Sequence, residues 1–421
     1  MKVGFVGPFG DSNFGDYGML INNIYDIKAK DITIFSYNIP LISKLAQKYL
    51  NNYNLSLCEV NLVSEPNSIV THNCKEYTIE YNNYPDTPFE ILKKVRNYQE
   101  ILEHIRRIDV LVVNGGGYFN HLWNAKHRRT RLLSIIAPIL IANQLKKKIV
   151  FMGNTYGPFE ESTNFFGNFF NYLDDCIIAS RDEVYSTSEL RKVGYGKPVQ
   201  HLPDDLYFLN KSFTLSADPS PTPPRKYIVL EFYSPISEVE TNLKQLGQLI
   251  TTMKCTYDYD VVFLPFDVNY GGEIQGKLLA RSFDDISIYD ISKLGYLDIS
   301  EANSIIKNAE FVICNRYHAF LLAIMNNIPV LHFLRDVCGD KRYYFNKGYG
   351  LLKSVFRNQT FSETDFFENS LTEAIERSII ECQAIQEKQK RLFNSKKAHQ
   401  ETILYERRMQ YIENNIWNST N

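Results

Sequence analysis

The sequence lacks the cysteine patterns that indicate a zinc site or a disulfide framework. Its seven cysteines are scattered, with an odd total and no C-x-x-C pair, which fits a reducing compartment and argues against structural zinc. Residues 1–7 have a strand pattern rather than the apolar block of a signal peptide. No uninterrupted apolar stretch approaches the ~20 residues that a membrane helix needs. We therefore expect a soluble, cytoplasmic protein.

A basic excess is also missing. The formal net charge is −2 over 421 residues, which argues against a general nucleic-acid binder, because such proteins usually carry a surplus of Lys and Arg. The hydrophobic fraction of 44% supplies enough apolar material for sizeable cores. Since the chain is too long for one core of ordinary size, we expect two domains in the α/β class.

Two nucleotide-binding signatures are absent from the glycine-rich loop Gly7–Asp16. The loop is neither G-x-G-x-x-G nor a Walker A sequence, so dinucleotide or ATP binding is not expected. It follows a short apolar run at residues 2–6 and precedes a helical pattern from Met19, as in a nucleotide-type α/β half-domain. Asn13 and Asp16 stand near the loop's end, where Asp16 either caps the helix or takes part in catalysis.

One event recurs along the chain: an apolar run ends in polar or glycine residues, and a helical pattern follows. This repetition indicates a parallel sheet with its functional edge on one side. The glycines at 115–117 let a ligand approach the backbone closely, although tight packing explains them equally well. The clearest examples are 109–117, 148–158, 176–190 and 226–253, while 199–203 leads into Asp204-Asp205.

Four prolines within nine residues favour an extended linker around residue 220. We therefore expect an N-terminal domain at 1–213, a linker at 214–225, a C-terminal domain at 226–365 and C-terminal helices at 366–421. The apolar spacing also predicts one helix over Phe89–Ile108 and another capped by Ser300. The Asn- and Tyr-rich segment 38–85 has no clear periodicity, and its structure is not predicted beyond a strand ending near its start.

The segment Phe311–Met325 places an arginine and a histidine where a predicted strand passes into a helix. Ligands bind at that edge of open α/β sheets, and a helix N-terminus favours an anion. Arg316 and His318 therefore predict a phosphate or carboxylate site, against the alternative of a surface turn. His332, inside an apolar strand, is expected in the core. His121 and His127, which flank Trp123, either line a binding site or belong to a plain loop.

The C-terminal helices carry basic residues interleaved with apolar ones. The pattern predicts a solvated helix face, and the alternative is a basic surface that leans on an anionic membrane. The basic residues are Lys388, Lys390, Arg391, Lys396, Lys397, Arg407 and Arg408.

Taken together, the ordered motifs resemble those of the polysaccharide pyruvyl transferase family. Two features depart from the family pattern. Glu231-Phe-Tyr233 ends a strand where related chains often carry a basic residue, and the loop Arg335–Lys341 is longer than expected. The matching motifs are the loop ending in Asn13-Phe-Gly-Asp16, Asn114–Gly117, Tyr156-Gly-Pro158, Ser180-Arg-Asp182, Arg316-Tyr-His318 and Asp340-Lys341.

The resemblance implies a GT-B-like fold, with two Rossmann-like domains whose parallel sheets face a central cleft. It implies phosphoenolpyruvate as donor and a sugar acceptor, galactose-type and either lipid-linked or part of a glycan, in the synthesis of a surface polysaccharide such as a capsule or exopolysaccharide. The product would be a pyruvate ketal on two hydroxyls, with release of phosphate. No cofactor and no metal are expected, and peripheral contact with the inner face of the membrane stays an alternative. A nucleotide-sugar glycosyltransferase and a non-catalytic sugar- or phosphate-binding protein are the competing hypotheses.

Roles follow from the donor's chemistry. Arginine forks suit the oxyanions of phosphoenolpyruvate, so Arg316, Arg181 and Lys341 are expected to bind the donor together with His318. His318 is the candidate acid, because its ordinary pKa lies near neutrality, and Asp16 is the candidate base. Acceptor binding is assigned to Asn13, Asp16, Gly116, Asn154, Tyr156 and Asp205.

Overall fold

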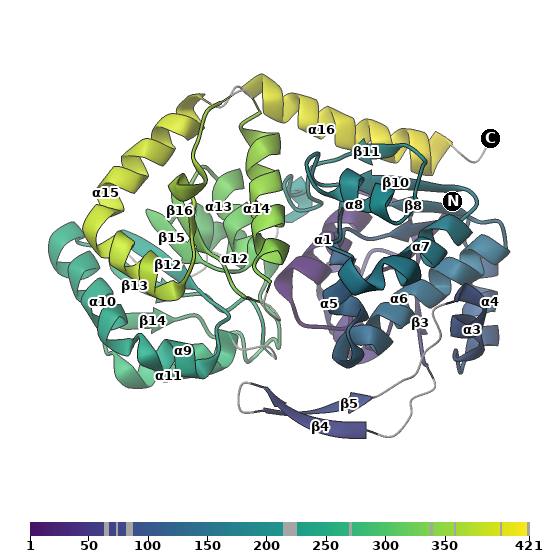
Figure 1. The fold of residues 1–421 in the computed structure, drawn as a ribbon, viewed down its shortest axis with the longest axis horizontal. Coiled ribbons are helices and arrows are strands. Elements are labelled where there is room, and N and C mark those ends of the chain that lie inside the picture. Colours follow the sequence, from purple (N-terminus) through teal and green to yellow (C-terminus); the bar gives the residue numbers. More distant parts are fainter. Residues whose placement is uncertain are drawn as a thin grey trace. The chain divides into compact units, whose positions relative to one another are not determined.

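The structure is a computed structural model, and it forms two compact units (Figure 1). Unit 1 comprises residues 1–11, 15–205 and 402–421, and unit 2 comprises residues 12–14 and 206–401. The predicted boundaries kept 12–14 in the N-terminal domain and gave the C-terminal helices a segment of their own. The predicted linker falls largely outside the residues that the structure describes, which are 1–62, 67–72, 75–80, 87–213, 225–268, 272–336, 340–357, 359–395 and 398–418.

Unit 1 is built on a nine-stranded sheet. All its strand pairs are parallel, as the recurring apolar runs predicted. Parallel strands are buried on both faces, which explains why these runs are apolar without alternation. The order is β3 (Asn54–Glu59), β2 (Asp31–Ser36), β1 (Lys2–Val6), β6 (Val110–Val113), β8 (Lys148–Phe151), β10 (Cys176–Ser180), β9 (Asn154–Tyr156) and β7 (Gly116–Phe119), with β11 (Val199–His201) also paired to β10.

Helices cover the sheet of unit 1, and one core joins them to it. Apolar residues of α4, α6 and α7 pack with Leu111 of β6 and Phe151 of β8 in this core. The helices are α1 (Phe14–Ile27), α2 (Ile39–Tyr49), α3 (Pro88–Lys93), α4 (Tyr98–Arg107), α5 (His121–Asn124), α6 (Lys126–Gln144), α7 (Thr163–Tyr172) and α8 (Ser186–Lys192), with a 3-10 turn at Glu160–Ser162. The segment 38–85 contributes α2, β3 and an antiparallel pair, β4 (Asn67–His72) and β5 (Lys75–Glu80).

The prediction of a single helix over Phe89–Ile108 is wrong, because the helical conformation is interrupted between α3 and α4. Around the break the backbone bonds to a neighbouring segment instead of continuing the helix: the Arg96 N–H donates to the Asn61 carbonyl at 2.8 Å. The Asn97 side chain donates to the Glu59 carbonyl and accepts from the Asn61 N–H. Tertiary pairing thus overrides a good helical period.

Unit 2 repeats the design with a six-stranded sheet. Its pairs are all parallel. Helices α10 and α15 pack on each other and on β13 and β16, while α13 packs on β15 and β16. The order is β14 (Ile286–Ile288), β13 (Asp260–Phe263), β12 (Tyr227–Glu231), β15 (Phe311–Cys314), β16 (Val330–Phe333) and β17 (Phe367–Glu368).

Helix α12 begins close to the position predicted from Ser300, whereas α11 and α14 were not predicted. One cap differs: Asp298, not Ser300, accepts the Glu301 N–H at the start of α12, because Ser300 already lies inside the helix. His332 is fully buried, with its ring 5.0 Å from that of Phe320, as predicted. The helices are α9 (Ile236–Thr241), α10 (Leu243–Tyr257), α11 (Gly272–Ser282), α12 (Ile299–Lys307), α13 (Tyr317–Met325), α14 (Arg342–Val355) and α15 (Leu371–Ser395), with 3-10 turns at Lys211–Phe213 and Glu363–Asp365.

The last segment, α16 (Ala398–Ile412) followed by a π-helical turn at Glu413–Trp417, returns the chain to unit 1. Arg408 on α16 is fully buried there. Its guanidinium donates to Asp26 Oδ2 at 3.0 Å, to Asp205 Oδ1 at 2.8 Å and to Asn23 Oδ1 at 2.6 Å. The prediction of a purely solvated or membrane-facing basic helix is therefore wrong at Arg408, whose charge pairs with two carboxylates that are themselves buried.

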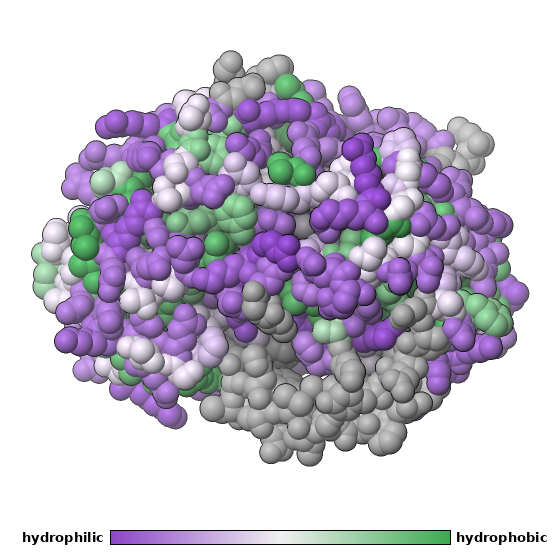
Figure 2. Space-filling view, in the orientation of Figure 1, coloured by the Kyte–Doolittle hydropathy of each residue, from purple (hydrophilic) through white to green (hydrophobic). Residues whose placement is uncertain are grey.

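One face of the molecule is mostly hydrophilic. Figure 2 shows a mostly hydrophilic face on which apolar groups are scattered in small areas. Among the helices of the described residues, none has the length and apolar character that crossing a bilayer requires.

Candidate active site

Arg316 lies where the strands of unit 2 end. It follows β15 and is the N-terminal cap residue of α13. The guanidinium Nε lies 3.5 Å from Glu231 Oε1, and Nη2 lies 3.4 Å from Asp267 Oδ2. Because Glu231 ends β12 and Asp267 follows β13, three neighbouring strands bring these groups to one edge of the sheet. This is the ligand-binding edge of open α/β sheets.

Residues 12–14 complete this cluster within unit 2. Nη1 of Arg316 donates to Asn13 Oδ1 at 3.1 Å, and the Ser12 hydroxyl donates to Asp267 Oδ1 at 2.9 Å. The Phe14 ring packs edge-on against Phe266. Asn13 was assigned to the acceptor, whereas the structure places its amide beside the arginine that was assigned to the donor.

Glu231 is a buried carboxyl beside Arg316. It is 0% exposed, and burial raises its pKa from 4.5 to about 7, against the opposing effect of Arg316. One carboxylate oxygen accepts the Arg316 backbone N–H at 2.9 Å. The charge balance around the guanidinium therefore changes near neutral pH. From the sequence, Glu231 was identified only as a departure from the family pattern.

We predict that Glu231 makes stability fall with rising pH. A carboxyl whose pKa is higher in the folded state keeps its proton longer there, so stability decreases between pH 4.5 and about 7 and is level above. Over this pH range the free energy of unfolding is expected to fall by about 3 kcal/mol. Glu231→Gln should flatten this decline, measured as the thermal unfolding midpoint between pH 5 and pH 8.

Glu240→Gln is the matched control for Glu231→Gln, because Glu240 is exposed. It should keep the wild-type pH dependence. Identical profiles for Glu231→Gln and wild type would contradict the prediction.

Tyr233 brings a second arginine close to Arg316. The Arg316 guanidinium carbon lies 4.6 Å from the centroid of the Tyr233 ring, and that of Arg335 lies 3.9 Å from the same centroid. Asn315 holds Tyr233 in place by accepting its N–H and donating to its carbonyl. Two guanidinium groups on one ring suit a small ligand with two anionic groups. Arg335 was not among the residues predicted to bind the donor, although the loop Arg335–Lys341 is longer than expected for the family.

His318 lies two residues beyond Arg316, in the first turn of α13. Its side chain is half-buried, and its ring meets that of Tyr317 edge-on at 5.0 Å. Arg316 and His318 are thus brought to one helix start, as predicted. Lys341, at the start of α14, is exposed and donates to the Asn369 carbonyl at 2.9 Å. Lys347 is a further basic group, buried with its ammonium 3.3 Å from the centroid of the Tyr343 ring.

The predicted residues of unit 1 are mostly buried in its framework. Arg181 pairs with Asp204 and donates to the Thr155 hydroxyl at 2.7 Å. Asn154 is fully buried and donates to the Met152 carbonyl, while the Tyr156 hydroxyl donates to the Ala179 carbonyl at 3.2 Å. These contacts fix the strand ends. They engage the Arg181 guanidinium and the Tyr156 hydroxyl, whereas Oδ1 of Asn154 is buried without a hydrogen-bond partner among the described residues.

Asp205 connects several groups at the strand-end edge of unit 1. Its carboxylate accepts from the Gly115 N–H at 2.9 Å, from Asn23 and from Arg408. Burial raises its pKa, and Arg408 opposes that shift. A Cβ at Gly115 would lie 2.3 Å from Asp205 Oδ2, so this glycine is required by close packing. Close packing therefore explains the glycine at position 115 of the glycine turn.

Asp16 lies in the first turn of α1 and is 8% exposed. The side-chain amide of Asn114, which follows β6, approaches the Asp16 carbonyl at 3.5 Å. The negative charge of Asp16 contributes to the raised pKa of Tyr118, which burial causes in the first place. Gly116 begins β7 close by. Asp16, Asn114 and Gly116 therefore share the strand-end edge of unit 1.

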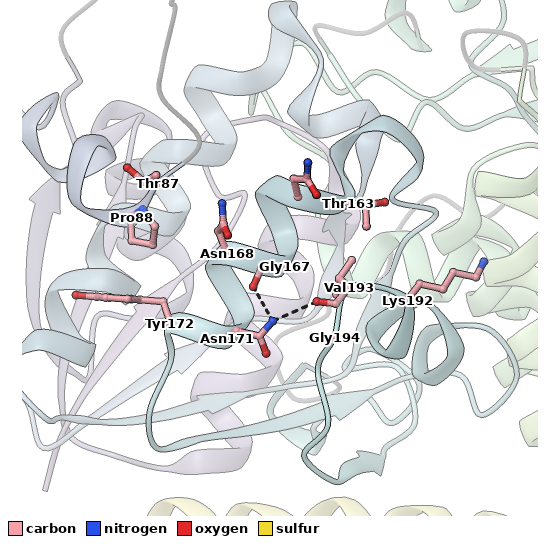
Figure 3. A pocket seen from close by; sticks show the side chains of 11 residues that line it. Thr87, Pro88, Thr163, Gly167, Asn168, Asn171, Tyr172, Lys192, Val193 and Gly194 are labelled. Atoms are coloured by element: carbon pink, nitrogen blue, oxygen red, sulfur yellow. Dashed lines mark hydrogen bonds between the residues drawn. The ribbon is translucent and has the colours of Figure 1, made fainter.

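A separate hollow of about 700 Å³ lies on unit 1 (Figure 3). Asn164, Asn168 and Asn171 of α7 are among the residues that line it, at helical spacing. Asn171 donates to the carbonyls of Gly167 and Val193. None of the predicted site residues lines it, so this hollow and the Arg316 edge are distinct features.

Several solved structures share the fold of this chain. A putative UDP-N-acetylglucosamine 2-epimerase from Listeria monocytogenes has a TM-score of 0.58 at 11% identity, with 99% of this chain and 97% of that one covered. The Neisseria meningitidis UDP-GlcNAc 2-epimerase bound to UDP-GlcNAc gives 0.55 at 11% identity, covering 97% and 100%. HepE from Anabaena in complex with UDP-glucose gives 0.53 at 11% identity, covering 100% and 99%. At such identity the likeness concerns the fold, which is GT-B-like, as predicted.

The family is defined by sequence. Residues 19–336 match the model of the polysaccharide pyruvyl transferase family, and the chain belongs to this family. The match includes Arg316 and His318, whereas Asn13, Asp16 and Lys341 lie just outside it. No curated protein matches the chain in sequence.

Proposed function

We propose that this protein transfers pyruvate from phosphoenolpyruvate to two hydroxyls of a sugar in a surface polysaccharide or its lipid-linked precursor. The family indicates a transferase that acts on polysaccharides. The observation that carries the choice of donor is the pair of guanidinium groups on Tyr233, next to the start of α13. Phosphoenolpyruvate carries a phosphate and a carboxylate on a small frame, and two arginines beside a helix N-terminus match both groups.

In the proposed mechanism Arg316 and Arg335 hold the donor, and His318 delivers a proton to its methylene carbon. A sugar oxygen bonds to the central carbon as its proton passes to a base, for which Asp16 stays our candidate. A second hydroxyl of the sugar then attacks the same carbon and passes its proton to the departing phosphate. The carbon–oxygen bond to phosphate breaks, so the products are the ketal and inorganic phosphate. Lys341 and Lys347 are secondary candidates for the phosphate.

The acceptor is proposed to meet Asn13, Asp16 and Gly116, whereas Arg181, Asn154, Tyr156 and Asp205 act through the framework that they hold. We expect no cofactor or metal in the transfer itself. A contact of the exposed basic residues of α15 with an anionic membrane stays a proposal. It is tested by flotation with anionic liposomes at low salt.

The test of the function is incubation with phosphoenolpyruvate and a galactose-terminated acceptor. We expect release of phosphate that depends on both substrates, together with a pyruvate adduct in the mass spectrum of the acceptor. UDP-glucose and UDP-GlcNAc should give no transfer. Transfer from a nucleotide sugar, with none from phosphoenolpyruvate, would replace this proposal by a glycosyltransferase.

We predict that Arg335→Ala weakens donor use. Loss of one charge-assisted contact costs about 1.5–3 kcal/mol, which corresponds to roughly a 10- to 100-fold fall in kcat/KM for phosphoenolpyruvate. The fall should come mainly from KM, because Arg335 acts in binding. Steady-state kinetics at varied donor concentration measure it.

Arg281→Ala is the control for Arg335→Ala, since Arg281 is exposed at the end of α11. Its kinetics should match wild type. An unchanged KM in Arg335→Ala would remove Arg335 from the donor site.

A further inference from the structure

Three side chains with metal-binding atoms meet at the edge of the unit 1 sheet, apart from the Arg316 cluster. They are Cys58 on β3 and the pair Glu100 and His104 on α4, and one ligand atom from each lies within 4.8 Å of the other two. Strand β3 is the outermost strand of the sheet, and α4 packs on it. Glu100 and His104 are four residues apart, so they project from one face of the helix.

Burial is graded across this group. Cys58 is 0% exposed, His104 is half-buried and Glu100 is exposed. The thiol thus forms the floor, and the carboxylate stands at the opening to solvent. Neighbours orient the other two groups: the His104 Nδ1 lies 3.4 Å from the Ser56 hydroxyl, and Asn97 donates to the Glu100 carboxylate at 2.9 Å. A cation could reach all three donors from solvent.

The charge around Cys58 is negative. Among the residues that the structure describes, neither Glu59 nor Glu100 forms an ion pair. The two carboxylates nearest to the thiol therefore keep their negative charges available to a cation.

We propose that Cys58, Glu100 and His104 bind a divalent transition metal such as Zn²⁺. Thiolate, imidazole and carboxylate are the ligands that Zn²⁺ takes in proteins, whereas Ca²⁺ and Mg²⁺ prefer oxygen alone. Three protein ligands leave a fourth position for water. Binding forms the bond between sulfur and metal and releases the thiol proton to solvent. The site joins α4 to the outermost strand, and it is independent of the proposed pyruvyl transfer.

The family resemblance implied that no metal is needed for the transfer, and this site does not bear on that expectation. Glu100 and His104 alone are a common helical pair, and Cys58 joins them only through the packing of α4 on β3. A single sequence does not predict such a group, because its members are distant along the chain.

The test is titration of the chelator-treated full chain with Co²⁺ alone. We expect saturation at about one metal per chain, a near-ultraviolet thiolate-to-cobalt band and visible bands of a tetrahedral site. About one proton should be released per metal at neutral pH. Zn²⁺ should then displace the cobalt and abolish the bands.

Cys58→Ser should lose the thiolate band, and Cys255→Ser, which alters an exposed free thiol, should keep it. Because Cys58 lies in the core, Glu100→Gln and His104→Gln provide a second test that does not disturb the strand, and each should weaken Co²⁺ binding at least about 10-fold. Absence of the thiolate band in the wild type, or its persistence in Cys58→Ser, would overturn the proposal. Unchanged affinity in both the Glu100 and His104 variants would do so as well.

Discussion

Replacement of His318 by alanine is expected to lower kcat for pyruvyl transfer by about 10²- to 10⁴-fold. The proton that saturates the methylene carbon must come from a group whose pKa lies near the working pH, and His318 stands two residues beyond Arg316 at the start of α13. Its ring is half-buried against Tyr317 rather than packed in the core. The variant should therefore fold normally, and the loss in kcat should exceed any loss of affinity for phosphoenolpyruvate. Single-turnover measurement with excess enzyme separates the chemical step from binding.

His201→Ala is a suitable control for His318→Ala, since His201 lies on β11 of unit 1 and its ring faces Glu183 at 3.8 Å. It should keep wild-type kcat. The pH profile adds a second criterion, because loss of the acid should remove the alkaline limb of the wild-type curve. If His318→Ala lost only donor affinity and kept kcat, His318 would be a binding residue and the acid would be another group.

Arg408→Met is expected to destabilise the protein by about 3–5 kcal/mol, the cost of leaving buried carboxylates without their counter-ion. Arg408 is 0% exposed, and its partners Asp26 and Asp205 are 7% and 0% exposed. Methionine fills much of the same volume, so the loss would come from charge rather than from a cavity. The midpoint of thermal unfolding at pH 7 measures the effect.

The neighbouring Arg407 provides the control. Its side chain is 35% exposed and pairs with Glu183 at 3.6 Å, and such surface pairs contribute at most about 1 kcal/mol. Arg407→Met should therefore shift the midpoint little. A triple variant with Asp26→Asn, Asp205→Asn and Arg408→Met should recover part of the lost stability, because none of these three positions then carries a buried charge. Equal midpoints for the two arginine variants would show that the buried cluster contributes nothing to stability.

The fold was largely predictable because its strands are buried on both faces. Runs such as Phe311–Cys314 and Val110–Val113 are apolar throughout, and each passes into a helix at polar or glycine residues. The local sequence does not predict the end of a helix that is caused by tertiary contacts. The break at Lys94–Asn97 depends on pairing with Asn61, and nothing in the spacing of apolar residues around it signals that partner.

The site was predictable where its residues are neighbours in sequence. Arg316 and His318 follow one strand, and that alone places them together. Asn13, Glu231, Asp267 and Arg335 reach Arg316 or Tyr233 through strand order and chain crossing, which a single sequence does not encode locally. The sequence does not distinguish Arg408 from its neighbour Arg407, although Arg408 is fully buried and the Arg407 side chain is 35% exposed.

The return of α16 to unit 1 has a consequence for synthesis on the ribosome. Unit 2 is encoded almost entirely within residues 206–401, so its core can close as soon as that stretch has emerged. Unit 1 begins first and finishes last, because Arg408 is translated 382 residues after Asp26 and 203 residues after Asp205. During that interval unit 1 is the part exposed to chaperones and proteases. Truncation before Arg408 should accordingly yield a chain in which unit 2 resists proteolysis and unit 1 does not.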